Sequence, residues 1–173
     1  MTHLDLVDPA FRRRSTPDRI TRADRPAEPD VRLRSMYFTV TPWRDPAVEP
    51  SGVDPRDPYV ERYWLGVLGP STVLLLRRFA RGLDERPEGF KVPVIDTSLA
   101  LGLGRGVGRN SPIIRTVDRA ETFGMLRRTA HDRIEARTRM PLLSPRQLRQ
   151  LPPVLRRLHA DWLRSQERNP DPR

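Results

Sequence analysis

The sequence predicts an α+β fold that is mainly helical and carries one small β-hairpin. Apolar residues recur at helical spacing in several stretches between residues 57 and 163, as amphipathic helices require. Aspartate-proline, glycine-proline and serine-proline pairs mark points where such stretches begin. A basic segment near residue 130 instead alternates with a period close to two, which is typical of paired strands.

Residues 1–56 are expected to form a largely disordered tail, because Pro, Asp and Arg dominate and large apolar side chains are scarce. The stretch MYFTVTPW, at 36–43, is the exception. It fits either an extended segment that docks its aromatic side chains on the folded domain or a short linear motif for a partner. The domain itself is expected to span 57–140.

Asp57 and Pro58 begin the first predicted helix, and Gly69 with Pro70 separates it from a second. The second helix is expected to be the central helix of the core, because arginines occupy only the side opposite its apolar face. The segment FKVPVI then predicts a short strand, and Pro93 confines this strand to a sheet edge. The apolar residues of the two helices are Val60, Tyr63, Trp64, Val67, Leu68, Val73, Leu75, Leu76, Phe79, Ala80 and Leu83.

Two further helices are expected, with a glycine-rich turn between them. Asp96 caps a short helix over 97–101, and Ser111 with Pro112 starts a longer one that Gly124 ends as a left-handed C-cap. The glycines of the turn are expected to supply the positive φ angles that a sharp reversal requires. These glycines are Gly102, Gly104, Gly106 and Gly108.

Residues 125–140 predict a β-hairpin whose turn is the His-Asp pair. Residues 141–166 predict a helical extension, and 167–173 a polar tail. The apolar stripe of the extension fits packing back on the core, and the alternative is a homodimer or protein partner bound through 151–163. The stripe consists of Leu151, Val154, Leu155, Leu158, Trp162 and Leu163.

This order of elements, over about residues 58–140, resembles the winged helix-turn-helix domain. The most specific part is the short helix DTSLALGL, a turn, the capped helix SPIIRTVDRAETFGM and a basic hairpin directly behind it. RAETFGML is similar to the end of recognition helices in such regulators. The turn departs from the family, because it is longer than the usual three or four residues. The resemblance implies a winged helix-turn-helix core with an added C-terminal helix.

Positive charge is concentrated in the second part of the chain. The net charge is +10, and nine of these excess charges fall from Gly104 onward. A localised basic excess indicates a polyanionic partner, most simply nucleic acid. Lys91 is the only lysine, and arginine can bind phosphates and guanine edges through two hydrogen bonds at once. A GC-rich genome is an alternative source of this bias.

The resemblance implies that the helix from Ser111 enters the major groove of duplex DNA, with Arg115 and Arg119 as base readers. Ser111 and the free backbone N–H groups of that helix start would hold a phosphate. Arg105 and Arg109 stand at the same helix start. The alternative for the helix arginines is a solvated face without a partner. The wing arginines, expected to contact the backbone or minor groove, are Arg127, Arg128, Arg133, Arg137 and Arg139.

No catalytic residue, cofactor or metal is expected. The glycine turn does not satisfy G-x-G-x-x-G, and no G-K-[ST] follows it. The chain has no cysteine, so a thiolate nucleophile and a Cys-based zinc site are excluded. His3, His131 and His159 have no spacing that would gather a metal.

The sequence therefore predicts a non-enzymatic, double-stranded-DNA-binding protein, either a transcription regulator or a DNA-maintenance factor. We expect it in the cytoplasm and away from membranes, because no signal-peptide pattern or bilayer-long apolar run is present. The alternative is a winged-helix module that binds proteins, or an accessory subunit of a larger nucleic-acid assembly. RNA recognition is disfavoured, because Phe123 and Trp162 are the only aromatics of the basic region and both lie on apolar stripes.

Overall fold

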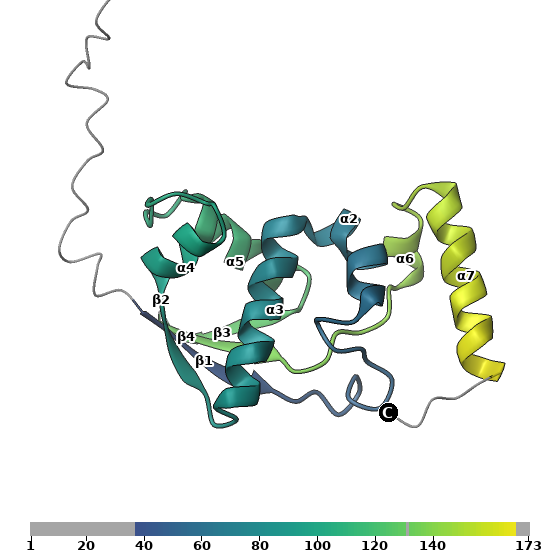
Figure 1. Ribbon diagram of the computed structural model, residues 1–173, viewed down its shortest axis with the longest axis horizontal. Coiled ribbons are helices and arrows are strands. Elements are labelled where there is room, and N and C mark those ends of the chain that lie inside the picture. The colour runs from purple at the N-terminus through teal and green to yellow at the C-terminus, as the bar shows by residue number, and fades with distance from the viewer. Residues whose placement is uncertain (1–36, 131, 169–173) are drawn as a thin grey trace, which may run out of the picture.

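In the computed structural model, helices pack against a four-stranded sheet, so the fold is α+β as predicted (Figure 1). The structure describes residues 37–130 and 132–168. The expectations for residues 1–36 and for 169–173 concern positions outside these ranges. A search of residues 37–130 and 132–168 finds no helix with the length and hydropathy of a membrane span.

The sheet has the order β2-β1-β4-β3. Strand β1 (Tyr37–Trp43) pairs antiparallel with β2 (Phe90–Pro93) on one side and parallel with β4 (Arg133–Arg137) on the other. Strand β3 (Leu126–Ala130) pairs antiparallel with β4 and forms the outer edge. The predicted hairpin and the predicted edge position of the proline-containing strand are both confirmed.

Strand β1 corrects the expected N-terminal boundary. Residues 37–56 were expected to belong to a largely disordered tail, apart from the possible docking segment at 36–43. The described part of that segment is extended as this alternative required, and β1 lies inside the sheet, with Phe38 and Val40 only 5% and 0% exposed. The turns that follow β1 are also attached to the domain, because Val53 and Met140 exchange two backbone hydrogen bonds of 2.9 and 2.8 Å. The composition of this segment misleads because two alternate apolar side chains and the backbone ladder are enough for a strand.

The first two predicted helices are present. A π-helical turn, η2 (Val60–Trp64), continues into α2 (Leu65–Leu68), and α3 (Pro70–Glu85) follows. The carboxylate of Asp57 accepts a backbone N–H two residues further on, at 2.7 Å, as expected of an N-cap. Gly69 has a φ of 79° and separates the helices. Every apolar residue predicted for these helices is buried.

Helix α4 (Val94–Ala100) starts three residues earlier than expected, whereas α5 (Pro112–Thr122) matches its prediction. The residue before α4 is Pro93, with an extended ψ of 121°, so strand β2 passes directly into the helix. Asp96 therefore lies in the first turn and is not the cap. Gly124 ends α5 with a φ of 69°, as predicted.

The C-terminal extension contains α6 (Pro145–Leu148) and α7 (Pro153–Arg168). Helix α7 stands at the end of the molecule opposite β2 and α4 (Figure 1). The predicted stripe is only partly correct, because Val154 and Leu158 are 53% and 42% exposed while His159 is 3% exposed. The helix is rotated so that His159 faces the ring of Tyr63, 5.0 Å away between centroids.

Candidate nucleic-acid interface

The glycine-rich turn between α4 and α5 is fixed to the domain at two points. Val107 at its centre is 5% exposed, and the Ser98 hydroxyl donates a hydrogen bond of 2.6 Å to the Gly104 carbonyl. Gly102 and Gly104 have φ angles of 69° and 77°, which confirms the expected positive φ at these two positions. The other two glycines of the turn lie outside the positive-φ region. The turn is therefore an anchored loop.

Four of the predicted DNA-contacting arginines are exposed and make no hydrogen bond or ion pair with any residue that the structure describes. Arg105 and Arg109 belong to the turn, Arg115 lies in the first half of α5, and Arg133 begins β4 beside the hairpin turn. Their charges are not neutralised within the described part of the chain. They are therefore available to an anionic partner.

The two acidic residues of α5 are both neutralised by the wing. Arg128 lies 2.5 Å from Asp118 and 3.6 Å from Glu121, and its backbone N–H donates to Glu121 at 3.1 Å. Such partly exposed pairs add little to stability. Their effect is electrostatic, because they cancel negative charge on this helix that would repel an anionic partner. Arg128 therefore acts as a counter-ion for α5.

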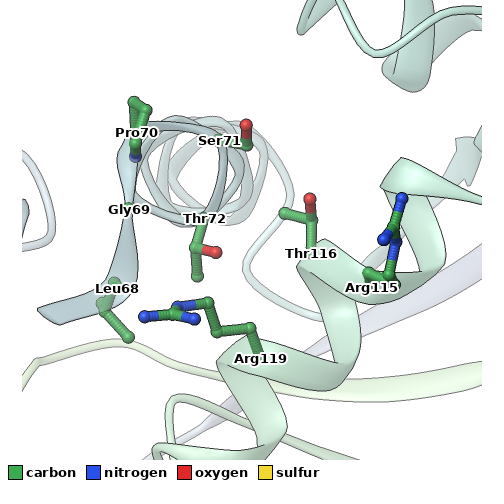
Figure 2. A pocket seen from close by; sticks show the side chains of 8 residues that line it. All are labelled: Leu68, Gly69, Pro70, Ser71, Thr72, Arg115, Thr116 and Arg119. Atoms are coloured by element: carbon green, nitrogen blue, oxygen red, sulfur yellow. The ribbon is translucent and has the colours of Figure 1, made fainter.

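Arg119 is exposed but held in position. Its guanidinium donates a hydrogen bond of 2.5 Å to the carbonyl of Val67 and lies 5.5 Å from the centroid of the Phe123 ring. Figure 2 shows Arg115 and Arg119 on the side of α5 that faces the start of α3. One of the two predicted base readers is thus unattached, and the other is tethered to the end of α2.

Two wing arginines stack on one tryptophan. The guanidinium carbons of Arg127 and Arg137 lie 4.6 and 3.9 Å from the centroid of the Trp43 ring, within the range of cation–π attraction. Arg127 also forms an ion pair with Glu135 on the neighbouring strand. These contacts join β1 to the hairpin.

Arg137 and Arg139 hold the chain that follows β1. Arg137 lies 2.7 Å from Asp45 and donates a 2.6 Å hydrogen bond to the carbonyl of Gly124, and its side chain is 12% exposed. The backbone N–H of Ala47 and then Arg137 lower the pKa of the Asp45 carboxyl below its ordinary value. Arg139 donates a 3.0 Å hydrogen bond to the carbonyl of residue 52. Both arginines have partners inside the domain.

Ser111 lies under the glycine turn. It is 9% exposed, its hydroxyl is enclosed without a hydrogen-bond partner among the described residues, and it makes no side-chain cap to α5. The structure therefore places this hydroxyl beneath the surface. The predicted phosphate contact therefore loses the Ser111 hydroxyl and keeps the backbone N–H groups at the start of α5.

The sequence reading missed Ser71 and Thr72. They lie in the first turn of α3, opposite Arg115 and Arg119 (Figure 2). The one local signal was the Gly69-Pro70 helix start, which offers no side chain as a cap. That this start faces α5 is a result of helix packing and has no sequence signature.

Within the described ranges, no group of three or more His, Cys, Asp or Glu residues could hold a metal ion. His3 and His131 lie outside those ranges. Comparisons of the chain with protein-family models, with curated proteins and with solved structures gave no match.

Proposed function

We propose that this protein is a non-enzymatic DNA-binding protein built on a winged helix-turn-helix domain. The order α3, β2, α4, α5 and the β3–β4 hairpin supports this fold, with β1 as an addition before it. In this proposal α5 enters the major groove and the hairpin is the wing. The protein would act in the cytoplasm as a transcription regulator or a DNA-maintenance factor.

The observation that carries the proposal is the distribution of neutralised and free charge around α5. Arg105, Arg109 and Arg115 are exposed without an internal partner among the described residues, whereas Arg128 neutralises both acids of the helix. A surface that removes its own negative charges and leaves its arginines free suits a polyanion. Arginine also provides the commonest specific contact to guanine in the major groove.

The hairpin offers fewer unpartnered arginines for DNA contact than its composition predicts. Arg133 is the wing arginine without an internal partner in the described part of the chain, and it stands next to the hairpin turn. The other four wing arginines of the prediction brace the domain. We therefore assign the wing one direct contact to the DNA backbone or minor groove, through Arg133.

Binding to random duplex DNA over a salt series tests this function. The logarithm of the affinity should fall with the logarithm of salt concentration, with a slope of about −0.9 per phosphate engaged. Arg115→Ala together with Arg119→Ala should weaken binding. Arg78→Ala, which removes an exposed charge from α3, is the matched control. Absence of binding at low salt would refute the proposal.

A protein-binding role is the second candidate, and one observation favours it. Val154 and Leu158 of α7 are 53% and 42% exposed, so part of the stripe at 151–163 is left uncovered by the described residues. A second copy or a protein partner would bury these side chains. Sedimentation of the full chain over a concentration range tests the homodimer, and a single monomeric species would exclude it.

A further inference from the structure

An open groove with a volume of about 490 Å³ lies between the start of α3 and the side of α5. One wall is the chain from Leu68 to Thr72, and the other consists of Arg115, Thr116 and Arg119 (Figure 2). The lining contains two arginines and no acidic residue. The groove therefore carries positive charge without a counter-ion among the described residues that line it.

The first wall presents backbone donors. The N–H groups of Ser71 and Thr72 lie in the first turn of α3, where an α-helix offers them no acceptor, and they donate to no other described backbone group. The preceding Gly69 supplies no capping side chain. These donors stand at the positive end of a helix of 16 residues, so an anion here is stabilised by both the N–H groups and the helix dipole.

The Thr72 hydroxyl is an independent sign of a ligand. Thr72 is 2% exposed, and its hydroxyl makes no hydrogen bond with any described residue. Figure 2 shows this oxygen directed across the groove toward α5. The residue itself is buried, yet this oxygen lines the groove and keeps its capacity to donate and accept hydrogen bonds there. Thr116 on the other wall differs, because its hydroxyl donates to the Pro112 carbonyl at 2.8 Å.

The second wall supplies the charge. Arg119 uses one N–H on the Val67 carbonyl at 2.5 Å, which fixes its guanidinium at the groove. Its other donors have no hydrogen-bond acceptor in the described part of the chain. Arg115 is exposed with no hydrogen bond or ion pair in the described ranges. Guanidinium groups match the oxygen geometry of phosphate.

We propose that this groove binds a phosphoryl oxyanion. The backbone N–H groups of Ser71 and Thr72 and the Thr72 hydroxyl donate to its oxygens, and Arg115 with Arg119 balance its charge. Two sources share this chemistry: a backbone phosphate of duplex DNA, which depends on the function proposed above, and a free phosphate group. The first source would place the start of α3 against the DNA strand beside the groove that α5 reads.

Titration of the full chain with inorganic phosphate at constant ionic strength tests the site. We expect saturable changes in the amide NMR signals of Ser71 and Thr72. Thr72→Val should weaken this binding about tenfold, because a hydrogen bond to a charged group is lost. Thr122→Val is the matched control, since that exposed hydroxyl donates to the Asp118 carbonyl. No saturable change at these amides, or equal binding by Thr72→Val, would overturn the proposal.

Thermal melting gives a second readout and checks folding. Without phosphate, Thr72→Val should melt close to the temperature of the wild type, because the Thr72 hydroxyl makes no hydrogen bond with any described residue. Phosphate should then raise the melting temperature of the wild type more than that of the variant. Arg115→Gln, compared with Arg78→Gln, provides a surface pair that tests the same site without altering a buried position.

Duplex DNA separates the two sources. If the oxyanion is a DNA phosphate, Thr72→Val should weaken duplex binding by a similar factor, and Thr122→Val should not. Phosphate binding without duplex binding would support the oxyanion site while removing support for the DNA function. Duplex binding with no response to phosphate at Ser71 and Thr72 would overturn the site and leave the DNA function standing.

Discussion

The predicted DNA-contacting arginines differ at the residue level in whether they have a partner inside the domain. One group projects outward without a partner among the described residues. The other group stacks on Trp43 or pairs with acids and carbonyls of the domain, and Arg119 combines an exposed position with an internal tether. The unpartnered group is Arg105, Arg109, Arg115 and Arg133, and the partnered group is Arg127, Arg128, Arg137 and Arg139.

This division predicts different effects for Arg115→Ala and Arg137→Ala. Arg115→Ala should cost about 1–3 kcal/mol of DNA-binding free energy with little change in the free energy of unfolding, because its side chain touches no internal partner. Arg137→Ala should lower the free energy of unfolding by about 1–3 kcal/mol, since it removes a charged hydrogen bond to the Gly124 carbonyl and the stack on the Trp43 ring. Urea unfolding and duplex binding measure the two quantities on the same samples.

Arg78→Ala serves as the control, because it removes an exposed charge from α3 and touches neither the surroundings of Arg115 nor those of Arg137. The reverse pattern would contradict the division of these arginines into an unpartnered and a partnered group. That pattern is a destabilised Arg115→Ala, or an Arg137→Ala variant that keeps full stability and loses only DNA affinity.

Helix α7, at the level of the single element, is attached through a polar contact in an aromatic cluster. The Tyr59 hydroxyl accepts the Leu143 N–H at 2.9 Å and lies 2.8 Å from Nε2 of His159. Both groups are satisfied when the phenol donates its proton to Nε2, which requires a neutral imidazole protonated at Nδ1. The Tyr59 ring also lies 4.6 Å from that of Trp162, so the cluster ties α7 to the start of η2.

The attachment of α7 is expected to weaken in mild acid. Burial lowers the pKa of His159 below its ordinary value of 6.5, so the unfolded chain takes up the proton first as the pH falls. The contribution is therefore complete above pH 6.5 and is lost as the pH falls through this value toward the lower folded pKa. The free energy of unfolding, measured at closely spaced pH values through this window, checks the prediction.

His159→Phe is the control for this titration, because it keeps an aromatic ring and cannot take up a proton. Its stability should stay level across the window in which the wild type declines. The carboxyls of Asp45 and Asp54 do not interfere, because folding lowers their pKa. Their contributions to the free energy of unfolding are lost only as the pH falls below 3.8, the ordinary pKa of the group. An identical decline in the variant would show that His159 is not the cause.

The whole molecule depends on β1, which lies between β2 and β4. A chain that starts at residue 57 lacks this strand, although it retains all the elements of the predicted domain. We expect it to lose cooperative unfolding. Strand β2 loses its one ladder partner among the described strands, β4 keeps only β3, and the contacts of Phe38 and Val40 disappear from the core. Thermal melting followed by circular dichroism, with the full chain as reference, checks this. A cooperative transition in the shortened chain would contradict it.

Several elements could be predicted because their signals act over a few residues. The Gly69-Pro70 break, the start of α5 after Ser111 and the left-handed end at Gly124 each follow from backbone angles and capping that neighbouring residues determine. The stretch at 36–43 was recognised as a candidate extended segment, but the place of β1 inside the sheet could not be predicted in the same way, because its partners β2 and β4 are tens of residues away. The buried face of α7 was also misjudged, since apolar spacing alone gave no reason to place His159 inside.

The sequence by itself determined the break at Gly69-Pro70, both ends of α5, the positive φ angles at Gly102 and Gly104, and the concentration of arginine after Gly104. Only the tertiary structure decided which of those arginines remain free, because their partners Trp43, Asp45 and Asp118 come from other elements. The same holds for the oxyanion groove, where the start of α3 meets α5 across a long stretch of chain. Capping and turn preferences depend on interactions between neighbouring residues. Charge neutralisation and strand pairing depend on distances between residues far apart in the sequence, and folding alone establishes these distances.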